Sequence, residues 1–315
     1  MSFFLSHFLD WLHPYQSIIR IVDRSLASSN RLLQSERRGE ELTRLSLSSH
    51  ENGVTSEQYD EGKKVVVSLT THGKRIFEVF KSIESIMQGT WLPNRIVLWL
   101  SDEYQGTPLP ETLVRQQNRG LEVAYVKDLG PHTKLIPALR QFPEDIIVTI
   151  DDDMYYQYDM LENLVKAYLS DPVSIHANRV TVMTFDEQNH LNGYLKWKHY
   201  IHPEKDTPRN LITGVEGCLY PPHALADEVF NESVFREKCR YADDVWFTAM
   251  ALLKGTLVKH VYTHYDRGCA GGLENISMQD IGLSIQNDNE VVCRNDIQIE
   301  AVFEHYNLYP LLLNE

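Results

Sequence analysis

The segment Ile146-Ile147-Val148-Thr149-Ile150-Asp151-Asp152-Asp153 decides the fold. Its apolar and β-branched first part predicts a strand that is buried on both faces, as in a parallel or mixed sheet. Ligands of open α/β sheets bind outside the carboxyl ends of the strands. Carboxylates crowded at such an end favour a divalent metal that carries a phosphorylated substrate, with a solvated acidic turn as the alternative.

Outward from this segment, strands alternate with helices of about ten to fifteen residues. Before it, we expect strands at 64–70, 95–100 and 121–126, and helices at 75–87, from about 110, and at 133–142. After it, we expect a strand at 180–184, a loop at 214–222, a helix at 242–254 and a strand at 257–262. This order predicts an α/β fold with a mainly parallel central sheet flanked by helices.

Residues 1–45 have a helical spacing of their own. Apolar residues recur every seven positions, with further ones three positions later, and together they are called the heptad face: Leu5, Phe8, Leu12, Tyr15, Ile19, Val22, Leu26 and Leu33. Pro14 lacks an N–H and therefore predicts a break into a short helix and a longer one. Because the polar positions carry both charges, homo-oligomerisation or docking is favoured, and contact with a membrane surface is the alternative.

Residues 46–62 are polar and lose the apolar period, which predicts a linker. The chain is therefore expected to consist of a helical extension at 1–45, the linker at 46–62 and a main domain at 63–315. No internal repeat and no low-complexity tract is found.

The composition excludes several classes of protein. With 315 residues, 43% of them hydrophobic and 23% charged, the chain resembles a soluble globular protein. A net charge of -14 argues against nucleic acid as a partner. The 4 cysteines form no CxxC pair, so neither a zinc site nor a disulfide framework is expected. Without an apolar run of about 18 residues or a secretory signal, we expect a cytoplasmic enzyme, with peripheral contact at the inner face of the cell membrane as an alternative.

A second acidic pair, Asp243-Asp244, begins the predicted helix at 242–254. Aspartates commonly cap helices and suit the helix dipole, which is the plainer explanation. The neighbouring aromatic residues Tyr241 and Trp246 equally suit a general base beside a bound sugar, since a carboxylate can take the proton of a hydroxyl. Strand alternation then places His260 and His264 on one face, and His264 at the strand end could bind a metal.

Polar residues at the other strand ends predict the donor side of a site. Thr70 and Thr71 follow the first strand, and Asp102 follows the second. These groups could bind a base and ribose, while Arg75 or Lys134 could neutralise a diphosphate. No glycine-rich phosphate fingerprint of the Rossmann or Walker type is present, which argues against a dinucleotide enzyme or a P-loop NTPase.

Together these motifs resemble the nucleotide-sugar-dependent glycosyltransferases of the GT-A fold, especially bacterial members such as those of glycosyltransferase family 2. The resemblance covers about 64–265 and rests on the first strand, the helix of Lys134, the Asp151–Asp153 segment, the loop at 214–222 and the Asp243-Asp244 helix. It implies a GT-A catalytic domain whose nucleotide-sugar half is about 63–153 and whose acceptor half is about 154–315.

The resemblance also implies a role for each motif. Asp151, Asp153 and His264 would bind Mn²⁺ or Mg²⁺ on the donor diphosphate, which is expected to be that of a UDP-sugar. Asp244 would be the base of an inverting transfer, with Asp243 beside it. The remaining donor-site residues would be Thr70, Thr71, Arg75, Asp102, Lys134, Asp152 and Glu216. The chain has Asp243 where the family more often has Glu, and the part after Gly272 matches no part of the family pattern.

The expected reaction is hexosyl transfer to a glycan or lipid-linked acceptor hydroxyl in surface polysaccharide synthesis. Two alternatives belong to other classes. A sugar-phosphate nucleotidyltransferase should carry a glycine-rich basic loop after the first strand, and 70–75 contains a single glycine. A non-enzymatic, metal-dependent sugar-binding module would need neither Asp243-Asp244 nor a nucleotide pocket.

Overall fold

The computed structural model describes residues 2–199, 206–261, 272–281 and 293–313. Its centre is a seven-stranded sheet with the order β10-β6-β9-β4-β1-β2-β3. The strands are β1 (Val65–Thr70), β2 (Arg95–Ser101), β3 (Leu121–Val126), β4 (Ile146–Thr149), β6 (Ile175–Ala177), β9 (Cys218–Tyr220) and β10 (Val258–His260). Neighbouring strands are parallel except where β9 pairs antiparallel with β4 and β6. The predicted α/β class with a mainly parallel sheet is confirmed.

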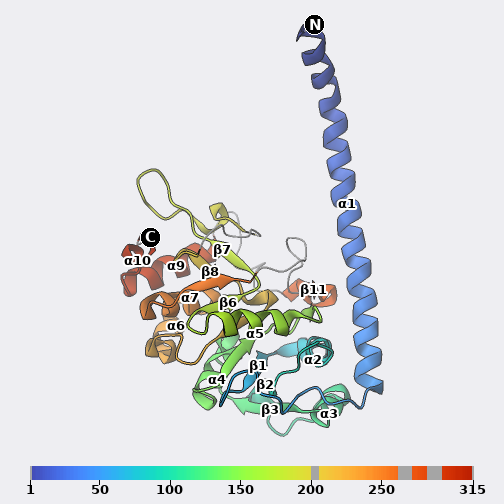
Figure 1. Ribbon diagram of the computed structural model, residues 1–315, viewed down its shortest axis with the longest axis vertical. Coiled ribbons are helices and arrows are strands. Elements are labelled where there is room, and N and C mark those ends of the chain that lie inside the picture. Colours follow the sequence, from blue (N-terminus) through green and yellow to red (C-terminus); the bar gives the residue numbers. More distant parts are fainter. Residues whose placement is uncertain (1, 200–205, 262–271, 282–292, 314–315) are drawn as a thin grey trace.

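Helices cover both faces of this sheet, because alternate residues of the buried strands point to opposite sides. Val65, Val67 and Leu69 of β1 face a layer that contains α2 (Val79–Met87), α3 (Glu111–Gln117) and α5 (Met160–Ser170). Val66 faces the other layer, which contains α4 (Ile136–Gln141), α6 (Glu232–Lys238), α7 (Asp243–Lys254), α9 (Arg294–His305) and α10 (Tyr309–Leu312). The result is a three-layer arrangement (Figure 1).

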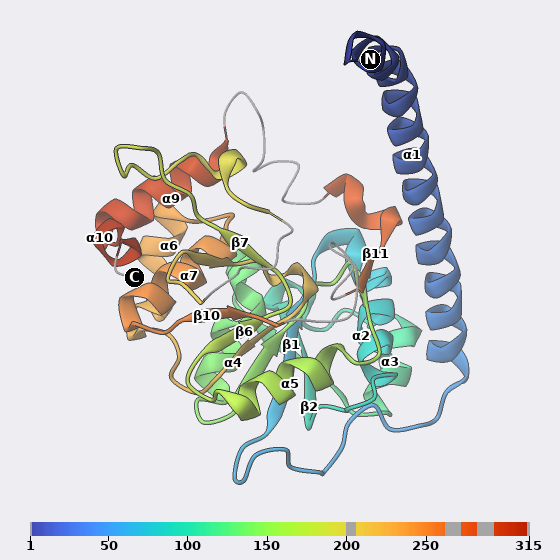
Figure 2. The same cartoon turned by 45° about the horizontal axis from the view of Figure 1, so that its top comes forward.

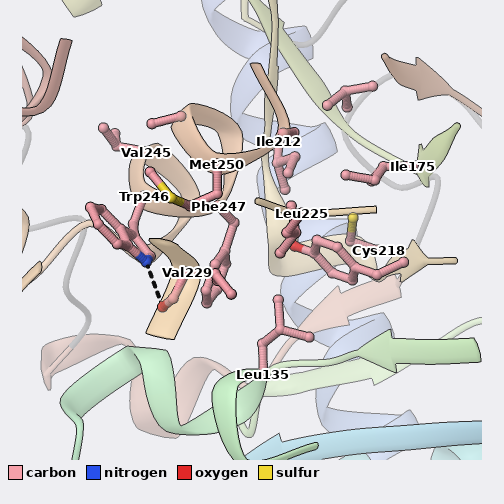
Figure 3. Close-up of a cluster of buried hydrophobic side chains, with 14 of the residues drawn as sticks. Leu135, Ile175, Ile212, Cys218, Leu225, Val229, Val245, Trp246, Phe247 and Met250 are labelled. Carbon is pink, nitrogen blue, oxygen red and sulfur yellow. Dashed lines mark hydrogen bonds between the residues drawn. The ribbon is translucent and has the colours of Figure 1, made fainter. Parts of the chain in front are cut away.

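The second layer is centred on helix α7, which is buried over most of its length. Figure 3 shows Phe247 and Met250 of α7 in one buried cluster with Cys218 of β9 and with Ile212. Trp246 Nε1 donates a hydrogen bond of 3.2 Å to the carbonyl of Val229. Burial on this scale fixes the start of α7, where Asp243 and Asp244 lie, relative to the sheet.

Two short antiparallel pairs lie outside the central sheet. Strand β5 (Met154–Tyr156) pairs with β11 (Gly272–Glu274), and β7 (Val180–Val182) pairs with β8 (Asn210–Ile212). The strand predicted at 180–184 therefore exists, but it belongs to one of these small pairs.

The N-terminal helix α1 (Ser2–Ser48) is continuous, so the predicted break at Pro14 is wrong. A proline removes only one N–H donor, and the turns on either side of it keep their own hydrogen bonds. The last third of α1 packs beside α2, α3 and β11, and Leu42 there is fully buried. Among the described residues, no helix combines the length and the apolar character that crossing a membrane requires.

The loop predicted at 214–222 is also wrong in its central part. Cys218–Tyr220 forms β9, which lies in the middle of the sheet with Cys218 opposite Thr149 and Tyr220 opposite Ile147. The flanking Gly217, Pro221 and Pro222 are typical of turns, and three residues are too few to show a strand period. Burial between β4 and β6 supplies the hydrogen-bonding partners that the local sequence does not reveal.

Candidate active site

The parallel strands β2, β1 and β4 are neighbours, so their carboxyl ends meet at one edge of the sheet. Thr70 closes β1, Asp102 follows β2, and Asp151–Asp153 follows β4. The structure thus brings together, at the place where open α/β sheets bind ligands, three groups of residues that are far apart in sequence.

Two cationic residues reach this edge from similar turns. Arg75 lies in a 3-10 turn at Gly73–Phe77, and Lys134 ends a 3-10 turn at Gly130–Lys134. The first residue of each turn is a glycine, with φ of +56° at Gly73 and +64° at Gly130, a region that side chains disfavour. Both cationic side chains are buried, so each turn delivers a fixed positive charge.

Arg75 binds the middle and last carboxylates of the acidic segment. Its Nη1 lies 2.6 Å from Asp152 Oδ1, and its Nη2 lies 3.1 Å from Asp153 Oδ2. Thr71 donates a hydrogen bond of 2.6 Å to the other oxygen of Asp152. Asp152 is therefore a buried residue that holds Arg75 in place, which gives a structural reason for an aspartate between Asp151 and Asp153. These carboxylates also raise the pKa of Arg75, although burial alone would lower it.

Lys134 joins the two acidic motifs. Its Nζ lies 2.8 Å from Asp151 Oδ1 and 3.0 Å from Asp243 Oδ2. Burial alone would lower the pKa of Lys134, but the carboxylates of Asp151 and Asp243 hold it well above its usual range. In turn, Lys134 keeps the pKa of Asp243 below its usual value in spite of burial. A permanent cation therefore connects the end of β4 with the start of α7.

Asp244 lies beside this ion-pair cluster and is oriented by the backbone. The N–H of Gly214 donates to its two carboxylate oxygens at 3.2 Å and 3.1 Å. Burial, followed by the charge of Asp243, raises the pKa of Asp244 to about 7. A Cβ on Gly214 would lie 2.9 Å from Asp244 Oδ1 and 3.3 Å from Lys134 Nζ, so only glycine permits this approach. The carboxyl group is thus held in place and can exchange a proton near neutral pH.

Tyr156 connects the acidic segment to the segment that contains Gly214. Its hydroxyl accepts a hydrogen bond of 2.8 Å from the N–H of Asp151 and donates one of 3.0 Å to the carbonyl of Val215. The backbone N–H of Tyr156 donates to Ser85 Oγ at 3.0 Å, which anchors β5 on helix α2. The two segments are therefore tied through a side chain that sequence analysis did not select.

Asp151 and Asp153 suit a divalent cation. Their side chains keep 26% and 13% of their accessible surface, so each can reach a ligand in solution. Burial, followed by the charge of Asp151, raises the pKa of Asp153 to about 7, although Arg75 acts to lower it. Within the described ranges, no three His, Cys, Asp or Glu side chains come together as a complete metal site. Mg²⁺ and Mn²⁺ commonly take one or two carboxylates and fill the other positions with water and phosphate.

The other predicted site residues are more scattered. Thr70 donates a hydrogen bond of 2.9 Å to the carbonyl of Trp99, and Asp102 is exposed at the end of β2. Glu216 is buried in an ion pair with Arg179. His264 lies outside the described residues, so its predicted metal contact stays a prediction.

Sequence reasoning missed Tyr156, Arg179 and the contact made by Gly214. Tyr156 lies in a three-residue strand beside another tyrosine, Tyr155, and nothing in the local pattern distinguishes the two. Gly214 was part of a predicted loop, and only the approach of Asp244 from 30 residues away shows why its lack of a side chain matters. Such contacts depend on sheet topology and leave no local pattern.

An open cavity of about 470 Å³ lies away from these residues, between the segment around Leu191 and helix α9. Trp197, Ile299 and Tyr309 are among its lining residues, and none of the predicted site residues lines it. The candidate site is therefore defined by its charged groups.

The sequence matches no protein-family model and no curated protein. Among solved structures, the chain is similar to the mannosyltransferase PcManGT from Pyrobaculum calidifontis in complex with GDP-Man and Mn²⁺, with a TM-score of 0.38 and 16% identity over 73% of this chain and 61% of that chain. It is also similar to TarS 1–349 of S. aureus in complex with UDP, with a TM-score of 0.41 and 13% identity over 65% of this chain and 59% of that one.

A CMP:2-keto-3-deoxy-manno-octonic acid synthetase complexed with CTP gives a TM-score of 0.40 and 12% identity over 72% of this chain and 99% of that chain. The present chain spans about three fifths of the mannosyltransferase and of the TarS fragment. Overlaps at this level do not assign an activity to this chain.

Proposed function

We propose that this protein is a metal-dependent glycosyltransferase that moves a sugar from a nucleotide-diphosphate donor to an acceptor hydroxyl with inversion. The observation that carries the proposal is the buried Lys134, which holds Asp151 at the end of β4 and Asp243 at the start of α7 in one cluster. Group transfer from a diphosphate needs positive charge at the leaving group and a base near the attacking group, and this cluster supplies both.

The donor half of the site would be the edge formed by β2, β1 and β4. Asp151 and Asp153 would hold Mn²⁺ or Mg²⁺, which when bound supplies positive charge to the donor diphosphate. Asp102 and Thr70, at the adjoining strand ends, would contact the nucleoside, for which uridine is expected. Thr71 donates a hydrogen bond to Asp152, and Asp152 in turn binds Arg75, so the role of Thr71 and Asp152 would be to hold Arg75 in position.

The acceptor half would be the start of α7 and the segment at Gly214. Asp244 would take the proton of the acceptor hydroxyl as that oxygen attacks the anomeric carbon. Its pKa of about 7 suits a base that works near neutral pH. The N–H of Gly214 keeps the carboxylate in one orientation, while Lys134 stabilises the departing diphosphate and stays protonated throughout. A glycan or a lipid-linked sugar of surface polysaccharide synthesis is the proposed acceptor class.

The test begins with a screen of UDP-, GDP- and CDP-sugars for Mn²⁺-dependent release of nucleoside diphosphate. The variant Asp244→Asn should lower release about 10²–10⁴-fold, the usual contribution of a general base, and should leave the Kd for the nucleoside diphosphate unchanged. Asp227→Asn is the matched control, because Asp227 is exposed on a different turn. Undiminished turnover by Asp244→Asn would refute the role of the base. Formation of a nucleotide-sugar from a nucleoside triphosphate and a sugar phosphate would favour nucleotidyl transfer instead.

A further inference from the structure

The N-terminal two thirds of α1 extend away from the rest of the molecule (Figures 1 and 2). Contacts with the body come from its C-terminal part, where Arg31 lies 3.9 Å from Glu274 and Ser35 donates a hydrogen bond of 2.6 Å to the carbonyl of Glu274. The residues before Arg31 would span about 45 Å as an α-helix. The chain therefore presents a long helical surface that is available to a partner.

This surface is apolar on one side. Val22, Leu26 and Leu33 of the heptad face expose 48%, 58% and 52% of their surface, whereas Leu42, further along the same helix, is fully buried. Helices in proteins owe most of their stability to burial of such a face, and an apolar stripe in water is unfavourable. The exposed part of the heptad face therefore calls for a covering surface.

The repeat of the heptad face indicates what covers it. From Leu5 to Leu26 the residues of the heptad face recur at 3.5 residues on average, which is the period of a left-handed coiled coil, and Leu33 continues the seven-residue spacing. A partner that fits this period must be a helix with the same repeat. We propose that the heptad face pairs with the heptad face of a second copy of this chain, forming a coiled-coil dimer.

The size of the heptad face is sufficient for such a dimer. At about 100 Å² of apolar surface per buried side chain, the eight residues on each of two copies would remove roughly 1,600 Å² from water. Stable and specific interfaces bury about 1,200–2,000 Å² in total.

The charges argue for a protein partner over a lipid surface. Residues 1–45 contain no Lys, and their sequence mixes the acidic Asp10 and Asp23 with the basic Arg20, Arg24 and Arg31. The whole chain carries a net charge of -14, which an anionic membrane would repel.

The test compares two double variants of the full chain. Leu26→Glu/Leu33→Glu places two charges on the heptad face, and Ser28→Glu/Gln34→Glu places two charges at exposed positions outside it. In sedimentation equilibrium from about 1 to 100 µM, the wild type and the Ser28/Gln34 variant should show twice the 36.5 kDa of one chain, and the Leu26/Leu33 variant should show 36.5 kDa. A wild type at 36.5 kDa throughout this range, or a Leu26/Leu33 variant at the doubled mass, would overturn the proposal.

A milder pair guards against a folding defect. Leu26→Ser/Leu33→Ser should keep the wild-type melting temperature of the body and should dissociate at a concentration at least about tenfold higher than the wild type does. Unchanged dissociation of this pair would contradict the dimer. Flotation with vesicles of phosphatidylcholine is the final check: a wild type that is monomeric in buffer and floats through Leu26 and Leu33 would assign the heptad face to lipid and overturn the dimer.

Discussion

Replacing Lys134 by Met tests whether the buried ammonium holds the candidate site together. The substitution keeps the length of the side chain and leaves Asp151 and Asp243 without their cation. Lys134 keeps only 9% of its side-chain surface and Asp243 keeps 10%, whereas Asp151 keeps 26%. Removing one partner of a buried ion pair costs about 3–5 kcal/mol, and the partial exposure of Asp151 places the expected loss at the lower end, about 3 kcal/mol.

The measurement is thermal unfolding at pH 8 and at pH 5. A loss of about 3 kcal/mol should lower Tm by roughly 6 °C at about 2 °C per kcal/mol. In the variant, burial without Lys134 should raise the pKa of Asp243 above its unfolded value of 3.8, so the folded variant gains stability as the pH falls from above that raised pKa toward 3.8. Wild-type Asp243 has a lowered pKa and its contribution persists down to 3.8, so the gap between the two proteins should narrow at pH 5.

Lys166→Met is the control for this experiment. Lys166 Nζ lies 2.5 Å from Glu162 Oε1, but the lysine side chain is 58% exposed. Exposed pairs contribute about 0–1 kcal/mol, so Tm should move by no more than about 2 °C. A Lys134→Met protein that melts within a degree of the wild type at pH 8, or whose deficit grows at pH 5, would refute the reasoning.

Further predictions concern the reaction. The transfer rate should rise with pH through about 7, because Asp244 accepts a proton only as a carboxylate, and Asp243→Asn should move this rise to lower pH by removing the charge that raises the pKa of Asp244; a flat pH–rate profile in the wild type would contradict both statements. Gly214→Ala should lower turnover at least about tenfold, because its Cβ would lie 2.9 Å from Asp244 Oδ1 and displace the carboxylate, while Tm stays close to that of the wild type; turnover at the wild-type level would show that this orientation is unimportant. Chelation by EDTA should abolish transfer and added Mn²⁺ should restore it, and Asp151→Asn should require at least about tenfold more Mn²⁺; transfer that survives chelation would rule out the metal.

The sequence predicts the regular first half of the fold better than the second. The strands β1 to β4 have four to seven residues, are rich in apolar side chains and are separated by helices, so they are visible in the residue pattern. Strands β6 and β9 have three residues each, and the place of β9 between β4 and β6 depends on partners far away in the chain. At Pro14 the local sequence predicts a helix break that the structure does not have, because the helical turns on either side of the proline keep their own hydrogen bonds.

The candidate site follows the same division. Adjacent carboxylates at strand ends and at a helix start indicate Asp151, Asp153 and Asp244. Ligands of open α/β sheets bind at the strand ends, and neighbouring carboxylates repel one another unless a cation is close by. The partners of these residues were hidden, since a contact such as that of Asp244 with Gly214 spans 30 residues and needs the sheet to bring the segments together. Sequence analysis also predicted that Asp152 contacts the donor, whereas its two carboxylate oxygens accept hydrogen bonds from Arg75 and Thr71.

The antiparallel strand β9 restricts where residues can be inserted into or deleted from this protein during evolution. Cys218 and Tyr220 point into one core and Leu219 into the other, while Cys218 pairs with Thr149, two positions before Asp151. One inserted residue between Gly214 and Tyr220 would exchange these faces or shift Gly214 away from Asp244. Homologues should therefore keep the number of residues from Gly214 to Tyr220 constant even where the residues differ, and should place their insertions between β7 and β8, where the register of the central sheet is unaffected.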